Sequence, residues 1–312
     1  MASTLRVVDT PDRIGPRLPY GRRVELPGRG TTFVREVEGP PGAPTLLLLH
    51  GWLASGGLNW FQAFPALGEH FRVVAPDLRG HARGLRSRRR FRLVDCADDA
   101  AALLAELDAG PVIAVGYSLG GAVAQLLWRR HRELVDGLVL CATAHHLMPG
   151  RREQAVFASF MAAAAGGSRF GELVARAPVR QVRALMPVPE TRARPSSLRE
   201  WARAEMRRHD MRLIVEAGWA MASYNAPWVD RIDVPTAMLI TTRDRAISPH
   251  AQFRTAVRIP GATLHRIDDG HVVCAKRMFA APLVDACMEV ASRTSGVLSG
   301  SGRTDHPTLA TP

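Results

Sequence analysis

The chain is almost without lysine: Lys276 is the single one, and every other basic residue is arginine. Arginine outnumbers the acidic residues, so the formal net charge is +12. Such a charge often indicates nucleic acid, an anionic membrane or acidic ligands as partners. Here the arginines are spread over the chain, as a GC-rich coding bias produces, and no DNA- or RNA-binding motif accompanies them. We therefore expect no nucleic-acid partner.

One local run departs from this even spread. Residues 83–92 read R-G-L-R-S-R-R-R-F-R. A run of like charges is most often a solvated loop, and we interpret this run in that way. The alternative left open is a weak contact with phosphate or with the headgroups of anionic lipids.

Long apolar runs and paired cysteines are also missing. No window approaches the roughly 18 apolar residues that a membrane-spanning helix needs. Residues 1–20 carry three prolines among charges and no apolar segment of the kind a secretory signal has, so we expect a cytoplasmic protein. The cysteines show no C-x-x-C spacing, which predicts reduced, mostly buried thiols and neither a disulfide nor a metal site. They are Cys96, Cys141, Cys274 and Cys287.

What the chain does have is apolar sequence in regular alternation. Hydrophobic residues make up 46 % of 312 residues, enough for one large core with one insertion. Apolar strand-like runs alternate with helical patterns, which indicates the α/β class and a mostly parallel sheet. We predict an irregular arm at 1–20, a core at 21–143, a helical insertion at 144–227, a second part of the core at 228–293 and a disordered tail at 294–312.

Strands and helices follow from the same pattern. The predicted strands are 22–26, 31–38, 45–49, 71–75, 111–115, 135–141, 235–241 and 263–267. The predicted helices of the core are 59–67, 95–108, 122–131, 249–257 and a last one that ends near 292. Those of the insertion, which the family resemblance given below identifies as a cap, are 153–165, 171–184 and 197–222.

The most informative stretch is Gly116-Tyr117-Ser118-Leu119-Gly120, between an apolar strand and a helical pattern. Glycines flank the serine because a sharp strand-to-helix turn leaves no room for side chains, and the same turn lifts the serine hydroxyl above the sheet. G-x-S-x-G alone is a weak signal, but its strand-turn-helix context is specific. We interpret it as a nucleophile elbow formed by Gly116, Tyr117, Ser118 and Gly120.

This elbow and four other blocks together resemble the α/β-hydrolase superfamily. The blocks are LLLLHGW at 46–52, PDLRGHARG at 76–84, TTRDRAISP at 241–249 and DDGH at 268–271, in the family's order over about residues 31–292. The resemblance implies a mostly parallel, eight-stranded-type sheet flanked by helices, with an inserted helical cap. One departure is Ala82, where the family usually has glycine.

The same resemblance implies a catalytic triad of Ser118, Asp244 and His271. An unassisted serine hydroxyl is a poor nucleophile, so an imidazole must take its proton and a carboxylate must orient that imidazole. Rival acids are Asp268 and Asp269, which are too close to His271 in sequence to reach its far nitrogen easily. The rival bases are His50, expected to be structural, and three histidines of the presumed cap, namely His145, His146 and His209.

The family also places an oxyanion loop after the strand at 45–49. We therefore expect the backbone N–H groups of Trp52 and Leu119 to bind the oxyanion. Aromatic and methionine side chains are concentrated in the presumed cap and beside the catalytic loops, which predicts an apolar acyl pocket. The candidate pocket residues are Trp52, Tyr117, Phe157, Phe160, Met161 and Trp219.

Three functions fit these residues. The first is a serine hydrolase that cleaves carboxylic esters, with medium-chain or lipid-like acyl groups favoured, through an acyl-enzyme and without a cofactor. The second uses the same triad to pass the acyl group to peroxide or another acceptor, as cofactor-free perhydrolases do. The third is a ligand-binding protein that keeps the fold without turnover. A serine nucleophile excludes the family's epoxide hydrolases and haloalkane dehalogenases, whose elbow carries aspartate. The sequence leaves the oligomeric state open.

Overall fold

A computed structural model describes Pro16, residues 18–147 and residues 197–300. Its centre is an eight-stranded sheet with the strand order β1-β2-β4-β3-β5-β6-β7-β8. β1 and β2 run antiparallel to their neighbours, and the other strands are parallel. The predicted fold class is therefore confirmed. The strands are Gly21–Leu26, Gly30–Val37, Thr45–Leu49, Arg72–Pro76, Val112–Tyr117, Val135–Cys141, Thr236–Thr241 and Thr263–Ile267.

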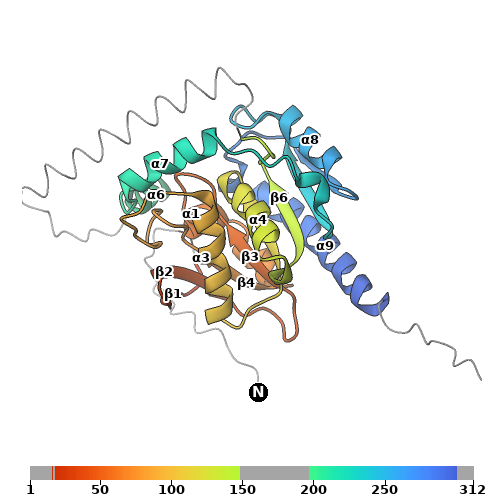
Figure 1. Cartoon of the computed structure of the whole chain (residues 1–312), viewed down its shortest axis with the longest axis horizontal. Coiled ribbons are helices and arrows are strands. Elements are labelled where there is room, and N and C mark those ends of the chain that lie inside the picture. Colours follow the sequence, from red (N-terminus) through yellow and green to blue (C-terminus); the bar gives the residue numbers. More distant parts are fainter. Residues whose placement is uncertain (1–15, 17, 148–196, 301–312) are drawn as a thin grey trace, which may run out of the picture.

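The central strands are buried on both faces because helices cover each side of the sheet (Figure 1). In β3, Leu47 and Leu49 face one core cluster while Leu46 and Leu48 face the other. The first cluster lies under α3 (Leu93–Glu106), α4 (Leu119–Arg130), α7 (Met211–Ala222) and α8 (Pro249–Arg258). The second lies under α1 (Gly56–Trp60), α2 (Phe64–Gly68) and α9 (Ala280–Gly300).

Two predicted helices are each divided in the structure. The helix predicted at 59–67 is α1 followed by α2, because Pro65 stands at the start of α2 and cannot continue a preceding helix. The helix predicted at 197–222 is α6 (Leu198–Met206) followed by α7. Asp210 begins α7 by accepting a hydrogen bond from the backbone N–H of Leu213, so the chain turns there.

The C-terminal helix is longer than predicted. α9 continues to Gly300, whereas the sequence predicted a helix end near 292 and a disordered tail from 294. The helices predicted at 153–165 and 171–184 lie outside the described residues. Short 3₁₀ helices occupy Arg132–Leu134, Val229–Arg231, Val273–Ala275 and Arg277–Phe279. No helix of the described residues has the length and apolar character to cross a membrane.

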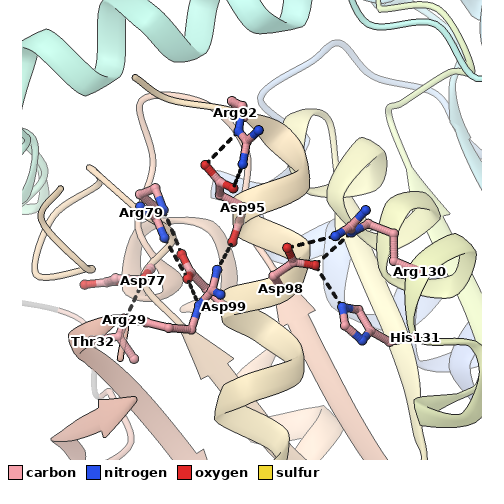
Figure 2. Close-up of polar contacts among 10 residues, drawn as sticks. All are labelled: Arg29, Thr32, Asp77, Arg79, Arg92, Asp95, Asp98, Asp99, Arg130 and His131. Carbon is pink, nitrogen blue, oxygen red and sulfur yellow. Dashed lines mark hydrogen bonds and ion pairs between the residues drawn. The ribbon is translucent and has the colours of Figure 1, made fainter. Parts of the chain in front are cut away.

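Ion pairs hold α3 to the rest of the molecule (Figure 2). The Asp99 carboxylate accepts two hydrogen bonds of 2.8 Å from the Arg79 guanidinium and one of 2.6 Å from Arg29 Nε. On the neighbouring face of the helix, Asp98 pairs with Arg130 of α4 at 2.8 Å. Because Arg79 lies in the loop that follows β4, the Asp99 pair fixes this loop at the carboxyl edge of the sheet, where the site lies.

Candidate active site

Ser118 occupies a strained turn between β5 and α4. β5 ends at Tyr117, α4 begins at Leu119, and Ser118 has φ 53° and ψ −115°. This left-handed backbone is uncommon for a residue with a side chain and costs free energy unless neighbours enforce it. The Ser118 backbone N–H donates to Cys141 O at 2.9 Å, and the Thr143 hydroxyl donates to Ser118 O at 2.8 Å. These contacts hold the serine at the edge of the sheet.

Close backbone approaches explain the glycines of the elbow. A Cβ atom at Gly120 would collide with the carbonyl groups of Leu49 and His50, at the end of β3. A Cβ atom at Gly116 would collide with the backbone of Gly120. The strand, the turn and α4 therefore pack at a distance that only glycine permits.

The side chains of Asp244, His271 and Ser118 form one hydrogen-bonded series. His271 Nδ1 lies 2.7 Å from Asp244 Oδ2, and His271 Nε2 lies 3.0 Å from Ser118 Oγ. Ser118 follows β5, Asp244 follows β7 and His271 follows β8, so three strand ends bring the residues together. The sequence places these residues up to 153 positions apart.

The Asp244 carboxylate is buried and fully hydrogen-bonded. Its Oδ1 accepts the backbone N–H groups of Ala246 and Ile247 at 2.8 and 2.9 Å, and its Oδ2 accepts the Thr241 hydroxyl at 2.8 Å. Burial by itself raises the pKa of this carboxyl, but the hydrogen bonds and the interaction with His271 outweigh it, and the pKa is lowered. The group is therefore an anion at neutral pH.

The rival acids have other partners. Asp268 is exposed and pairs with Arg243 Nε at 3.0 Å. Asp269 pairs with Lys276 Nζ at 2.6 Å and accepts the backbone N–H of Gly270 at 2.7 Å. The imidazole of His271 thus meets Asp244, as the sequence predicted, and neither neighbouring aspartate has replaced it.

The rival histidines lie in other hydrogen-bond arrangements. His50 is fully buried and accepts the Leu78 N–H at Nε2, 2.9 Å away, so its Nδ1 donates to Gly51 O. His145 bonds to the Thr255 hydroxyl at 2.8 Å, and His209 Nδ1 accepts the Ala82 N–H at 2.7 Å. Burial lowers the pKa of His50 to about 3 and that of His145 to about 4. His146 forms an isolated β-bridge with Asn225.

The two expected oxyanion donors lie on either side of the serine. Leu119 follows Ser118 and is the first residue of α4, whose first N–H groups have no acceptor within the helix. Trp52 follows Gly51, where a Cβ atom would lie 3.5 Å from Ser118 Cβ. The turn is closed by a hydrogen bond from Ala54 N to Gly51 O. The site therefore brings together a serine hydroxyl, an imidazole and a buried carboxylate, with the start of α4 next to the serine.

The sequence is similar to those of several known proteins. Residues 44–166 match the family described as "alpha/beta hydrolase fold". A poly(3-hydroxyalkanoate) depolymerase of Ectopseudomonas oleovorans is 30 % identical over 271 residues, 84 % of this chain and 90 % of that protein. The chain belongs to the α/β-hydrolase family.

Two further similarities cover most of this α/β hydrolase. The magnesium-chelatase 30 kDa subunit of Rhodobacter capsulatus is 29 % identical over 261 residues, 75 % of this chain and 83 % of that protein. A thermophilic esterase from Thermogutta terrifontis has a TM-score of 0.66 and 23 % identity, covering 88 % of this chain and 99 % of its own. At this identity the solved structure shows the shared fold alone.

The structure describes three of the six candidate pocket residues. Tyr117 is buried and packs against Trp60 and Phe279. Trp219 lies under the guanidinium of Arg90, 3.5 Å from the ring centroid. Trp52 is half-buried beside the serine. The remaining candidates, Phe157, Phe160 and Met161, lie outside the described residues.

The arginine run at 83–92 is not a simple solvated loop. Arg83 forms two hydrogen bonds, of 2.7 and 2.5 Å, with the buried carboxylate of Glu205 on α6. The Phe91 backbone N–H donates to Glu216 of α7 at 2.8 Å. The run therefore fastens α6 and α7 to the core. The sequence did not predict these contacts, because Glu205 and Glu216 lie more than 100 positions from the run.

Other supporting residues also escaped the sequence analysis. Thr241 and Gln252 hold the Asp244 carboxylate, and Gln252 Nε2 additionally donates to Ile247 O at 2.7 Å. Thr241 could have been found, because it ends the strand three residues before Asp244. Within residues 18–147 and 197–300, no three His, Cys, Asp or Glu side chains are grouped as metal ligands.

Proposed function

We propose that this α/β hydrolase is a serine esterase that cleaves carboxylic esters through an acyl-enzyme. The observation that carries the proposal is the series Asp244–His271–Ser118, with Ser118 on a strained elbow. A purely structural role would account for a buried aspartate or a buried histidine. It would not account for a half-exposed imidazole placed between a buried anion and a serine hydroxyl.

The three side chains have distinct roles in the proposed reaction. His271 Nε2 takes the proton of Ser118 Oγ as this oxygen attacks the ester carbonyl, and the protonated imidazole then gives the proton to the leaving alcohol. Asp244 keeps the second proton of His271 on Nδ1 and stabilises the imidazolium while it exists. Water, activated by the same imidazole, then releases the acid from Ser118.

The backbone N–H groups of Trp52 and Leu119 are proposed to bind the oxyanion. The negative charge develops on the former carbonyl oxygen in both halves of the reaction, so fixed donors lower both barriers. The position of Leu119 at the start of α4 adds the positive end of the helix dipole to its N–H group.

Esters with medium-chain or lipid-like acyl groups are the proposed substrates. The name of the depolymerase relative refers to a polyester, and we extend ester cleavage to this chain on that basis. The same triad would also serve acyl transfer to peroxide or another acceptor, and measuring the partition between water and peroxide distinguishes the two. A ligand-binding protein without turnover is the remaining alternative.

Labelling with a fluorophosphonate tests the proposal. The reagent should modify the wild type at Ser118, and Ser118→Ala should lose the label and lower kcat by several orders of magnitude. Oxyanion binding and substrate binding alone leave on the order of 10³-fold acceleration over water in well-studied triads. Ser223→Ala, at an exposed serine after α7, is the matched control and should keep both the label and the wild-type kcat. Labelling that persists in Ser118→Ala, or a wild type that is not labelled, contradicts the proposal.

We also propose a cytoplasmic location with weak contact between the arginine run and anionic lipid. Arg88 and Arg89 carry this proposal because they are exposed, whereas Arg83 is engaged by Glu205. A basic residue near an anionic surface contributes about 1 kcal/mol. Flotation with phosphatidylserine vesicles should therefore show weak binding that Arg88→Gln combined with Arg89→Gln abolishes. Equal binding of the double variant would contradict the contact.

A further inference from the structure

One hydrogen bond joins the elbow to the loop of the histidine. The Tyr117 hydroxyl donates to the backbone carbonyl oxygen of His271 at 2.5 Å, across 154 positions of sequence. Tyr117 directly precedes Ser118, and His271 lies in a turn between β8 and the 3₁₀ helix at Val273–Ala275. The two residues that must exchange a proton are thus linked by a contact outside the triad itself.

The tyrosine side of this link is rigid. The Tyr117 ring is 3 % exposed and packs edge-on against Trp60 and Phe279, with centroid distances of 6.2 and 5.7 Å. Burial raises the pKa of the phenol, so the hydroxyl keeps its proton and remains a donor. The Cys274 thiol interacts with the same hydroxyl, on the side of the short 3₁₀ helix.

The histidine side is held by fewer contacts. His271 belongs to no helix or strand, its side chain is 26 % exposed, and the next residue, Val272, is 68 % exposed. The imidazole must nevertheless meet Asp244 Oδ2 and Ser118 Oγ at the same time. A backbone that shifts by an ångström would lose one of these contacts, and such a shift costs about 100-fold in rate.

We propose that Tyr117 is a positioning residue, whose hydroxyl fixes the backbone of His271 so that the imidazole reaches both partners. This inference deepens the proposed esterase function and rests on it. The Tyr117 ring also lies beside the His271 ring, with centroids 5.9 Å apart, so the proposed role of the hydroxyl is exerted through His271. This role is distinct from the pocket role expected from the sequence.

Tyr117→Phe is the test, because it removes the hydroxyl and keeps the ring. We expect kcat per fluorophosphonate-titrated active site to fall about 10- to 100-fold, since a misplaced base slows proton transfer. KM for a short soluble ester should change little when acylation and deacylation slow together, which pre-steady-state burst and single-turnover measurements check. A purely structural role would lower the melting temperature and the number of titrated sites, with kcat per site unchanged.

Two variants serve as controls. Tyr224→Phe removes a second buried hydroxyl, which bonds to Gln125 Oε1 at 3.2 Å on the opposite face of the sheet, and should keep kcat per site. Cys274→Ala leaves the hydrogen bond from Tyr117 to His271 in place and should also keep the wild-type kcat per site. If Tyr117→Phe does not fold, Tyr117→Met removes the hydroxyl and fills the site with a flexible apolar side chain, and its kcat per titrated site should fall by at least as much.

The outcomes separate this inference from the proposed function. An active, labelled wild type with unchanged kcat per site in Tyr117→Phe, or an equal loss in Tyr224→Phe, overturns the positioning role alone. A wild type that is not labelled at Ser118 overturns the esterase proposal before Tyr117 is considered.

Discussion

The indole N–H of Trp52 donates a hydrogen bond of 2.9 Å to the backbone carbonyl of Ile214 on α7. Trp52 is an expected oxyanion donor through its backbone, and α7 belongs to the region expected to form the cap. The side chain of one residue therefore ties the oxyanion loop to a helix 162 positions later in the chain. The placement of α7 and the placement of the backbone donor are linked.

This link predicts that Trp52→Phe reduces turnover although the backbone N–H remains. Loss of an oxyanion donor costs about 10²- to 10³-fold in kcat, and a displaced donor should cost part of that, about 10-fold. The measurement is kcat for a short nitrophenyl ester. Trp228→Phe is the control, because Trp228 is half-buried and stacks on Trp128, 5.9 Å away. Equal rates for the two variants would contradict the link.

Asp244→Asn should be severely impaired with a melting temperature close to that of the wild type. Only the carboxylate behind the imidazole sets its tautomer and stabilises the imidazolium, a role worth about 10⁴-fold in kcat. Asp268→Asn and Asp269→Asn should have mild effects, because their partners are Arg243 and Lys276. Steady-state kinetics of the three variants compare them directly, and a dead Asp268 or Asp269 variant would refute the assignment.

Buried neutral histidines predict a loss of stability in mild acid. Burial lowers the folded-state pKa of His50 to about 3, that of His145 to about 4 and that of His81 well below its ordinary value. The unfolded chain binds these protons near pH 6.5, about the ordinary histidine pKa. Their contribution to stability is complete above that pH and declines as the pH falls toward the folded-state values.

Urea unfolding between about pH 7 and about pH 5 measures this slope, to which each of these three histidines should contribute the uptake of up to about one proton on unfolding. His145→Gln should reduce the slope by about one proton, about 1.4 kcal/mol per pH unit. A slope that is the same in His145→Gln and in the wild type would refute the assignment for His145.

Esters with longer acyl chains should have a higher kcat/KM if the pocket is apolar. Each methylene that leaves water contributes up to about 0.8 kcal/mol, nearly fourfold in kcat/KM when the gain reaches the transition state. From acetyl to hexanoyl nitrophenyl esters, kcat/KM should rise by about one to two orders of magnitude and then level off. A series that is flat or falls from acetyl onward would indicate a small or polar pocket and favour acyl transfer to peroxide.

The local pattern of residues was sufficient to predict the strands of the sheet and the sharp turn at Ser118. A strand buried on both faces requires a continuous apolar run, so β3 and β6 were predicted at their observed bounds, Thr45–Leu49 and Val135–Cys141. The elbow required glycines where the backbones of β3 and α4 nearly touch. The resemblance to the family, rather than local chemistry, implied the set Ser118, Asp244 and His271, whose three strand ends the parallel sheet brings together.

The tertiary structure decided what the distant side chains contact. The hydroxyl of Tyr117 meets the backbone of His271, and the arginine run meets the carboxylates of Glu205 and Glu216 rather than water alone. No local pattern carries this information, because each contact joins residues more than a hundred positions apart. A carboxylate or hydroxyl that is buried away from water needs a hydrogen-bond partner within the protein. Only the packed structure determines which donor or acceptor lies close enough to be that partner.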